Sequence, residues 1–337
     1  MNVAINGFGR IGRATFKAFL LKKDKKINVV AINDLTDTAT LAHLLKYDSC
    51  YGEFEMDVKS TKDSLVVGGK KYRVFAEKDP SVLPWKNLKV DVVIESTGIF
   101  LTHEKASLHL KAGAKKVILS APGKDDSVKT FVMGVNEDKI KKTDHIISNA
   151  SCTTNCLAPV TECFRKEFGI KKAIMTTIHS YTADQNLVDG PHKDLRRSRA
   201  AAVNMVPTTT GAAKSVTITI PSLKDKFDGL AVRVPTPVAS LCDVTFLAGK
   251  KVTSEQVNNC FIKASRLAKY KGILEVTDEP LVSSDFIGNP ASTIVDLELT
   301  KVVDGDLVKV VAWYDNEWGY SNRLVDMVIY MGRKKFM

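Results

Sequence analysis

Apolar and polar residues follow two different patterns along the chain, and the change falls near its middle. Residues 3–6 form a short apolar stretch, and residues 10–22 then place apolar side chains mostly on one side, which predicts a strand followed by an amphipathic helix. A second apolar stretch, residues 26–34, predicts another strand. Strand, helix and strand within about 30 residues predict a parallel βαβ unit, because a parallel crossover needs a helix.

Three more apolar stretches in the first half predict buried strands, each of which ends at small or polar residues: 91–97 (DVVIEST), 115–122 (KKVILSAP) and 144–150 (DHIISNA). Such ends are typical of the loops at the carboxyl edge of a parallel sheet, where α/β proteins bind their ligands.

The second half is dominated by alternating, β-rich stretches with few helices between them, which predicts a mixed or antiparallel sheet. The stretches are residues 171–181, 215–221, 230–235, 242–249, 292–300 and 306–314. One amphipathic helix is predicted over 253–269 with Ser254 as its cap, and another in the final segment, SNRLVDMVIYMGRKK.

The fold class expected from these patterns is α/β with two domains, since domains typically contain about 100 to 200 residues. Residues 1–151 are predicted to form a Rossmann-type dinucleotide-binding domain, on which a C-terminal helix over 317–337 packs. Residues 152–316 are predicted to form an α+β catalytic domain with a mixed or antiparallel sheet.

Composition narrows the class of protein. Hydrophobic residues make up 44% of the 337 residues, and no apolar run approaches the roughly 18 residues that span a bilayer, so a membrane protein is not expected. No secretory signal is visible at the N-terminus, and the six cysteines are sparse and irregularly spaced, so we expect a cytoplasmic protein with reduced thiols. The net charge of +11 suits either nucleic acid or small anions, but the lysines are spread along the chain, so nucleic acid is not expected as the main partner.

Gly7, Gly9 and Gly12 have the spacing G-x-G-x-x-G between the first strand and its helix. This motif fits a dinucleotide, because the tight turn, the exposed backbone under the pyrophosphate and the close helix packing each need a glycine. Asp34 ends the second strand about 20 residues later, where a carboxylate accepts from the ribose hydroxyls and repels a 2'-phosphate. The sequence therefore predicts NAD rather than NADP.

Cys152 lies in the segment SNASCTTNC, at the point where a predicted strand gives way to a helix that begins near Thr153. It can be a reactive nucleophile, half of a metal site with Cys156, or a small core residue. The amides of a helix N-terminus stabilise a thiolate and lower its pKa. No second cysteine pair or histidine cluster completes a tetrahedral metal site, so no metal is predicted, and Cys156 is interpreted as a packing residue, as are Cys163, Cys242 and Cys260.

His179 ends another apolar strand and can serve as the acid or base beside Cys152, although a lone histidine is more often structural. A thiolate adds to an aldehyde to form a hemithioacetal, whose C–H can transfer hydride to NAD and leave a thioester. A cysteine, a histidine and a nicotinamide site together therefore favour an aldehyde dehydrogenase.

Two features suggest anion binding. The segment PTTTGAAKSV, residues 207–216, offers hydroxyls and free amides, although it can equally be a polar turn. Arg233 lies in an otherwise apolar strand, where a half-buried arginine needs a carboxylate or phosphate partner. Arg196, Arg197 and Arg199 either line the same region or join a subunit contact.

Taken together, these motifs closely resemble phosphorylating glyceraldehyde-3-phosphate dehydrogenase, of the bacterial type. The matching segments run in order from residue 2 to about residue 330: NGFGRIG, IND, ESTG, SAP, SNASCTTNC, HSYT, PTTTGAAK, RVPTP and WYDNEWGYSNR. The resemblance implies a cytoplasmic, glycolytic homotetramer that oxidises D-glyceraldehyde 3-phosphate with NAD and inorganic phosphate to 1,3-bisphosphoglycerate.

The resemblance also implies roles for individual residues. Cys152 would be the nucleophile, and His179 would activate it, steady the hemithioacetal oxygen and act as base. Residues at the positions that bind attacking phosphate are Ser151, Thr153, Thr210 and Gly211; those around the substrate's own phosphate are Thr182, Asp184, Arg197 and Arg233. On the cofactor side, the adenosine and pyrophosphate positions are Arg10, Ile11, Asp34, Lys78 and Ser120, Asn316 would hold the nicotinamide carboxamide, and Tyr320 would lie beside the ring.

Few positions depart from the family pattern. Lys78 stands where many members have arginine, which keeps the charge and loses the planar fork. Gly190 and Pro191, with Asp34, resemble the NAD-preferring pattern. Three rival functions remain: an erythrose 4-phosphate dehydrogenase, a nucleic-acid or surface-binding protein suggested by the charge, and a cysteine hydrolase that would leave the first domain without a role.

Overall fold

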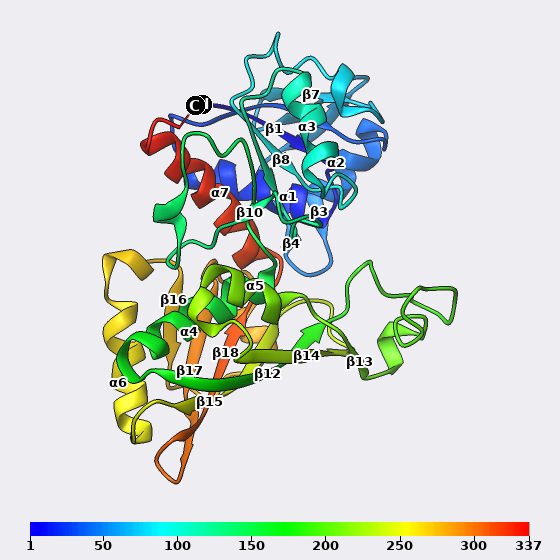
Figure 1. Ribbon diagram of the computed structural model, residues 1–337. Coiled ribbons are helices and arrows are strands. Elements are labelled where there is room, and N and C mark those ends of the chain that lie inside the picture. The colour runs from blue at the N-terminus through cyan, green and yellow to red at the C-terminus, as the bar shows by residue number, and fades with distance from the viewer. Residues whose placement is uncertain (337) are drawn as a thin grey trace. The chain divides into compact units, whose positions relative to one another are not determined.

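The computed structural model describes residues 1–336, which divide into two compact units (Figure 1). The first unit contains Met1–Phe131, Asp138–Ala150 and the C-terminal residues from Ser321 onward, and the second contains Val132–Glu137 and Ser151–Tyr320. The domain limits expected from the sequence stay a prediction. Met337, the last residue of the expected C-terminal helix, lies outside the described residues.

The first unit is built on a nine-stranded sheet in the order β10-β11-β9-β8-β1-β2-β7-β6-β5. Its strands from β10 to β7 are parallel, and β5 and β6 add an antiparallel edge. The strands are β1 (Asn2–Asn6), β2 (Asn28–Asn33), β5 (Val58–Thr61), β6 (Ser64–Val67), β7 (Lys70–Phe75), β8 (Val92–Glu95), β9 (Lys116–Leu119), β10 (Lys129–Thr130) and β11 (Ile146–Ser148), beside a small β3 (Tyr47–Asp48) and β4 (Gly52–Glu53) pair.

Helices of the first unit are α1 (Arg10–Lys22), α2 (Thr38–Lys46), α3 (His103–Lys111) and most of α7 (Trp318–Arg333). The segment from β1 through α1 to β2 confirms the predicted parallel βαβ unit, because the apolar face of α1 is buried and β1 pairs with β2 in parallel. From β1 the chain turns to β2 on one side, and β8 flanks β1 on the other, so the strand order reverses there. Ligands of open α/β sheets bind at such a reversal.

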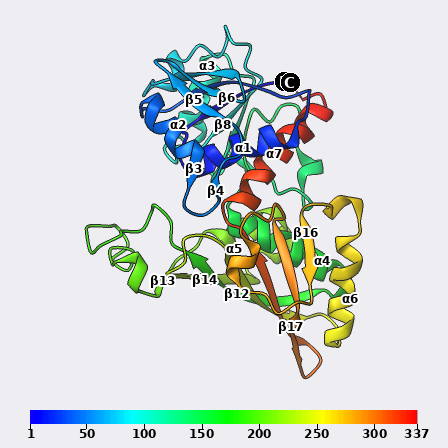
Figure 2. The ribbon, with the colours of Figure 1, turned by 180° about the vertical axis from the view of Figure 1, so that it is seen from behind.

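The second unit contains a seven-stranded sheet in the order β13-β14-β12-β15-β18-β17-β16. Both parallel and antiparallel pairs occur, which confirms the predicted mixed sheet. Three helices pack on it, and Figures 1 and 2 show them beside the sheet. The elements are β12 (Ile170–Ser180), β13 (Val206–Thr208), β14 (Phe227–Val234), β15 (Ser240–Ala248), β16 (Leu274–Thr277), β17 (Thr293–Val303), β18 (Leu307–Tyr314), α4 (Cys152–Phe168), α5 (Ala212–Thr219) and α6 (Ser254–Ser265).

One predicted strand is wrong. Residues 215–221 were expected to be extended because Val, Thr and Ile alternate there, whereas residues up to Thr219 continue helix α5. Ala212, Val216 and Thr219 are buried at helical spacing, and α5 packs against α4 and β14. Packing of this face therefore outweighs the strand preference of the β-branched residues.

Helix ends differ slightly from the predicted ones. Thr253, not Ser254, caps α6, because its hydroxyl accepts from the Gln256 amide while the Gln256 side chain accepts from the Thr253 amide. Helix α4 begins at Cys152, since the Ser151 side chain accepts from the amide of Thr154. Helices α2 and α3 were not predicted.

None of the helices within residues 1–336 is long and apolar enough to cross a membrane.

Candidate functional site

A pocket of about 520 Å³ lies at the carboxyl ends of β1, β2 and β8 in the first unit. This is the place at which the strand order reverses. Its lining includes four of the predicted cofactor residues together with polar and apolar neighbours, in all Asn6, Gly7, Gly9, Asn33, Asp34, Leu35, Glu77, Lys78, Ser96, Thr97, Ile99 and Phe100.

Steric contacts explain why a glycine occupies the first and third positions of the G-x-G-x-x-G motif, and open space explains what the second glycine provides. Gly7 has a φ of +88°, and a Cβ there would lie 2.8 Å from the carbonyl carbon of Ser96. A Cβ at Gly12 would lie 2.1 Å from the carbonyl oxygen of Gly7, so the helix approaches the turn too closely for any side chain. Gly9 is exposed and a Cβ there would meet nothing within 4 Å, which leaves its backbone open to a ligand.

Asp34 follows β2 and is only partly buried. One carboxylate oxygen accepts from the Phe8 amide at 2.6 Å and the other from the Thr36 amide at 2.9 Å. The carboxylate therefore braces the glycine turn as well as lining the pocket. Each carboxylate oxygen has a further lone pair for a ribose hydroxyl.

Two asparagines that line this pocket, Asn6 and Asn33, were not predicted as site residues. The Asn33 amide group donates to Asn6 at 2.7 Å and to the Glu77 carbonyl at 2.9 Å. The signal for this pair was present, because both strands β1 and β2 end in asparagine at paired positions.

Glu95, at the end of β8, is fully buried and also supports the pocket. Its carboxylate accepts from the Thr97 amide at 2.8 Å and from Asn6 at 2.6 Å. His109 lies 3.0 Å from the same carboxylate, and the Trp85 indole donates to the other ring nitrogen at 3.0 Å. Since Nδ1 accepts, Nε2 carries the proton and donates to Glu95. His109 is 14 residues from Glu95 and Trp85 is 24 residues from His109, so local sequence patterns did not reveal this network.

Three further predicted cofactor residues, Arg10, Ile11 and Ser120, belong to the first unit but do not line this pocket. Arg10 forms an ion pair of 3.2 Å with Asp48 and lies over the ring of Tyr51. Ile11 is in the first turn of α1, and Ser120 directly follows β9, where its amide donates to the carbonyl of Glu95.

In the second unit, Cys152 and His179 are brought together from the start of α4 and the end of β12. Cys152 Sγ lies 3.5 Å from His179 Nε2. His179 Nδ1 lies 2.7 Å from the carbonyl oxygen of Ser180, which can only accept, so Nδ1 carries the proton. Nε2 of the neutral ring is therefore an acceptor that faces the thiol.

Burial controls the charges of this pair. It raises the pKa of Cys152 to about 11, against the smaller opposing effects of the Thr153 hydrogen bond and the charge of Arg233. Burial and then the charge of Arg233 lower the pKa of His179 to about 3. The low thiol pKa expected from the helix start is thus not found, because burial outweighs it. The resting pair is a thiol that donates to a neutral imidazole.

Thr153 is held by a chain of hydroxyl groups. Its Oγ1 lies 2.9 Å from the Tyr314 hydroxyl, which lies 2.9 Å from Thr177 Oγ1. Thr177 donates to the carbonyl of Leu241 at 3.1 Å, so it accepts from Tyr314, and Tyr314 in turn accepts from Thr153. While Cys152 is a thiol, the hydroxyl proton of Thr153 is therefore directed at Tyr314, and the hydrogen bond by which Thr153 lowers the pKa of Cys152 forms with the thiolate.

Four residues expected around a substrate phosphate also gather here. Arg233 is opposite His179 in the pairing of β12 with β14 and donates to Thr182 at 2.9 Å and to the Ser180 carbonyl at 3.2 Å. Arg197 pairs with Asp184. Burial is the main cause that lowers the pKa of Arg233, and the positive charge of Arg197 is the next. The two guanidinium groups are therefore close enough to act on each other and form one positively charged region.

Other predicted residues of the second unit occupy defined positions. Gly211 is the N-cap of α5, and the Thr210 hydroxyl accepts from the Ala212 amide at 3.2 Å. Asn316 is buried, and its side-chain oxygen accepts from Ser240 at 3.0 Å, so its amide group remains a donor. Tyr320 is buried, and burial raises the pKa of its hydroxyl.

Cys156 lies one turn deeper than Cys152 and is fully buried, 3.5 Å from Thr293 Oγ1, as a packing residue would be. Cys163 and Cys242 are also buried, whereas Cys260 is only partly so. Within residues 1–336, no group of three or more His, Cys, Asp or Glu side chains is arranged to hold a metal ion.

Known proteins resemble this chain along almost its whole length. Residues 1–103 match a family model described as the NAD binding domain of glyceraldehyde 3-phosphate dehydrogenase, and residues 151–316 match that of its C-terminal domain. The chain is 54% identical over 335 residues to glyceraldehyde-3-phosphate dehydrogenase of Geobacillus stearothermophilus, 54% over 338 residues to that of Mycobacterium avium, and 52% over 335 residues to that of Streptomyces coelicolor. Each alignment covers 99% of both chains.

Proposed function

This chain belongs to the glyceraldehyde-3-phosphate dehydrogenase family and uses NAD as its cofactor, and on that premise we propose which of its residues carry out the reaction. The activity is the NAD-dependent oxidation of glyceraldehyde 3-phosphate in glycolysis, in which inorganic phosphate is taken up to give 1,3-bisphosphoglycerate. The observation that carries the assignment of residues is the contact of 3.5 Å between Cys152 Sγ and His179 Nε2.

Cys152 is the nucleophile in this proposal. His179 Nε2 takes the thiol proton as sulfur adds to the aldehyde carbon, and the same proton then neutralises the aldehyde oxygen, which gives a hemithioacetal. The net charge of the cysteine, the histidine and the aldehyde together stays zero during this transfer, which suits a buried site where neither residue ionises alone.

His179 next serves as the base for oxidation. It removes the proton of the hemithioacetal hydroxyl while the C–H bond breaks, and NAD, when bound, accepts the hydride. The hydrogen bond from Nδ1 to the Ser180 carbonyl keeps the ring oriented throughout. The product on Cys152 is a thioester. An oxygen of inorganic phosphate attacks its carbonyl carbon, the C–S bond breaks to release 1,3-bisphosphoglycerate, and the Cys152 thiolate takes back the proton held by His179.

Two sets of residues are proposed for the two phosphates. Arg233 and Arg197, with Thr182 and Asp184, surround the phosphate of the substrate, where two guanidinium groups supply charge and donors. Attacking phosphate binds at Ser151, Thr153, Thr210 and Gly211. Helix N-termini support this second set, because both α4 and α5 begin there and the positive end of each helix dipole favours an anion.

Cofactor binding is proposed for the pocket at the glycine turn. Gly9 leaves backbone exposed for the pyrophosphate, and Asp34 accepts from the adenosine ribose and repels a 2'-phosphate. Lys78 lines the same pocket. Arg10, Ile11 and Ser120 complete the adenosine side, and Asn316, as a donor, holds the nicotinamide carboxamide with Tyr320 beside the ring.

A homotetramer in the cytoplasm is the proposed state of the protein. Large apolar side chains are exposed on the segment between β12 and β13, which is long and mostly irregular in Figure 1: Leu187, Val188, Leu195, Val203 and Met205. Exposed apolar side chains clustered on one segment are typical of a subunit contact.

Spectrophotometric NAD reduction tests the function. The purified protein is given glyceraldehyde 3-phosphate or erythrose 4-phosphate, each with and without inorganic phosphate. We expect turnover that depends on phosphate and favours the three-carbon aldehyde. Phosphate-independent turnover that favours the four-carbon sugar would show an erythrose 4-phosphate dehydrogenase instead.

A further inference from the structure

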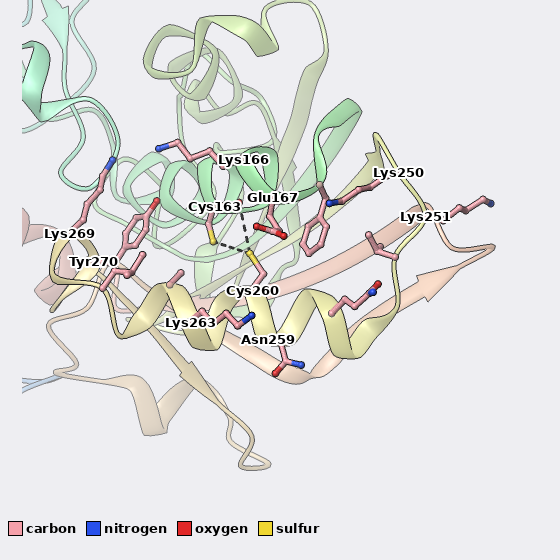
Figure 3. Close-up of a pocket in the computed structure, with 15 residues that line it drawn as sticks. Cys163, Lys166, Glu167, Lys250, Lys251, Asn259, Cys260, Lys263, Lys269 and Tyr270 are labelled. Atoms are coloured by element: carbon pink, nitrogen blue, oxygen red, sulfur yellow. Dashed lines mark hydrogen bonds between the residues drawn. The ribbon is translucent and has the colours of Figure 1, made fainter.

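Helices α4 and α6 pack against each other in the second unit, and a pocket of about 600 Å³ opens beside them (Figure 3). Two cysteines, Cys163 from α4 and Cys260 from α6, line it, and the reaction proposed above uses neither. Cys163 is 11 residues beyond Cys152 on the same helix, about 16 Å along its axis at a rise of about 1.5 Å per residue. The pocket is therefore separate from the nucleophile.

The two thiols are in direct contact. Cys163 Sγ and Cys260 Sγ lie 3.3 Å apart, and Figure 3 shows the two side chains pointing toward each other across the gap between the helices. A disulfide bond is about 2.05 Å long, so the sulfur atoms need to approach by only about 1.2 Å.

The two thiols differ in access and in acidity. Cys163 is buried, whereas Cys260 is partly exposed in the pocket. A hydrogen bond from Cys163 lowers the pKa of Cys260, and the charges of Lys263 and Lys250 act in the same direction, against burial and Glu167. The pKa of Cys163 is raised, first by the same hydrogen bond and then by burial. Cys260 is thus the attacking sulfur and Cys163 the resolving one.

We propose that Cys163 and Cys260 form a second redox site, at which hydrogen peroxide produces a reversible intramolecular disulfide. In the first step the Cys260 thiolate attacks one peroxide oxygen, the O–O bond breaks, and a sulfenic acid and hydroxide form. In the second step Cys163 sulfur attacks the Cys260 sulfur, the S–O bond breaks, and water leaves with the Cys163 proton. Two thiols are oxidised and one peroxide is reduced to two waters; a dithiol reductant reverses the change by exchange.

The pocket explains why this pair and not another would react. Cys156 and Cys242 also interact, but both are fully buried, so a solute cannot reach them in the folded protein. Cys260 combines an open approach, neighbouring lysines and a resolving thiol in contact. These are the three features of a redox-sensing cysteine.

Peptide mapping tests the proposal. The reduced protein is treated with hydrogen peroxide in the presence and absence of dimedone, which traps sulfenic acids; remaining thiols are alkylated, and the digest is analysed by mass spectrometry without reduction. We expect a linked Cys163 and Cys260 peptide pair that dithiothreitol separates. In Cys163→Ser, Cys260 should carry dimedone, and in Cys260→Ser, Cys163 should remain a thiol.

Two further comparisons sharpen the test. Lys263→Gln should slow the oxidation of Cys260 several-fold, while Lys251→Gln should not, because Lys251 faces Asp304 and Asp306. The disulfide would close a loop across 97 positions, so oxidation should raise the unfolding temperature of the unmodified chain and of Cys152→Ser but not of Cys163→Ser. Recovery of Cys163 and Cys260 as thiols after Cys152 is fully oxidised would overturn the proposal, as would a Cys260 sulfinic acid formed without the link.

Discussion

His179 Nε2 lies 3.5 Å from Cys152 Sγ, with the imidazole proton held on the opposite nitrogen by the carbonyl of Ser180. The ring therefore meets the thiol with a lone pair and not with a proton. This orientation makes the histidine a proton acceptor at the start of the reaction.

Replacing His179 by asparagine should remove this acceptor while keeping a polar side chain. We expect kcat to fall by about 10² to 10⁴, the usual contribution of a positioned acid or base. Alkylation of Cys152 by iodoacetamide at neutral pH should slow as well, because the thiol has lost its proton acceptor. Unchanged alkylation in a folded variant would contradict the role.

Acid should destabilise the protein through the same histidine. Its pKa is about 3 in the folded state and about 6.5 when unfolded, so the unfolded state binds the proton first. The stability is fully present above about pH 6.5 and is lost as the pH falls toward 3. Urea unfolding at pH 7 and pH 5 should differ by about 2 kcal/mol more in the unmodified protein than in His179→Asn. An equal pH dependence in both would refute this account.

Serine at position 152 and serine at position 156 should have different effects. Cys152→Ser should abolish dehydrogenase activity while NAD still binds, since the hydroxyl is a far weaker nucleophile. Cys156→Ser should keep activity and lower the free energy of unfolding by about 1 to 2 kcal/mol, because a fully buried sulfur is replaced. The two variants are distinguished by fluorescence titration with NAD, by turnover and by urea unfolding. Equal loss of activity in both variants, when both are folded, would contradict the separate roles of Cys152 and Cys156.

Removal of the Tyr314 hydroxyl should affect Thr153 through their hydrogen bond. Tyr314→Phe leaves Thr153 without its acceptor and Thr177 without its donor, which costs about 1 to 3 kcal/mol if neither finds a new partner. We expect the KM for inorganic phosphate to change more than the KM for the aldehyde. Steady-state kinetics with each substrate varied in turn measures this, and an equal change in both would argue against Thr153 as a phosphate ligand.

Asp34→Ala should weaken the preference for NAD. Without the carboxylate, the ribose loses its acceptor and a 2'-phosphate is no longer repelled. The ratio of kcat/KM for NAD to that for NADP should therefore fall by about tenfold or more, as expected for about 1.4 kcal/mol or more. A ratio that does not move would exclude the ribose role.

Much of the fold could be predicted from the spacing of apolar residues and from the small or polar residues that end each apolar stretch. Residues 10–22 were predicted as a helix with the bounds that α1 has, and the run of strands in the second half indicated the mixed sheet. The strand predicted over residues 215–221 was wrong because alternation of β-branched residues cannot reveal that Ala212 and Val216 are buried in a helix that packs against α4. Tertiary packing decided that segment, and packing is not visible in a short window.

The site was predicted unevenly for a similar reason. Gly7, Gly9 and Gly12 have a spacing that sequence alone can show, and the distances around them agree with it. The pKa of Cys152 was expected in the wrong direction, because a helix start can be inferred from sequence and the degree of burial cannot. The network of Glu95 with His109 was missed because its members are joined only by the fold.

The two amides that the Asp34 carboxylate accepts from, Phe8 and Thr36, tie the choice of cofactor to the integrity of the turn. A variant selected for NADP by losing the whole carboxylate also loses the brace on its glycine loop. Evolution toward the phosphorylated cofactor would therefore need a compensating change that restores those acceptors before, or together with, the loss of the carboxylate. Protein engineers should likewise try Asp34→Asn or Asp34→Ser, which keep an acceptor oxygen, before substitutions that remove it.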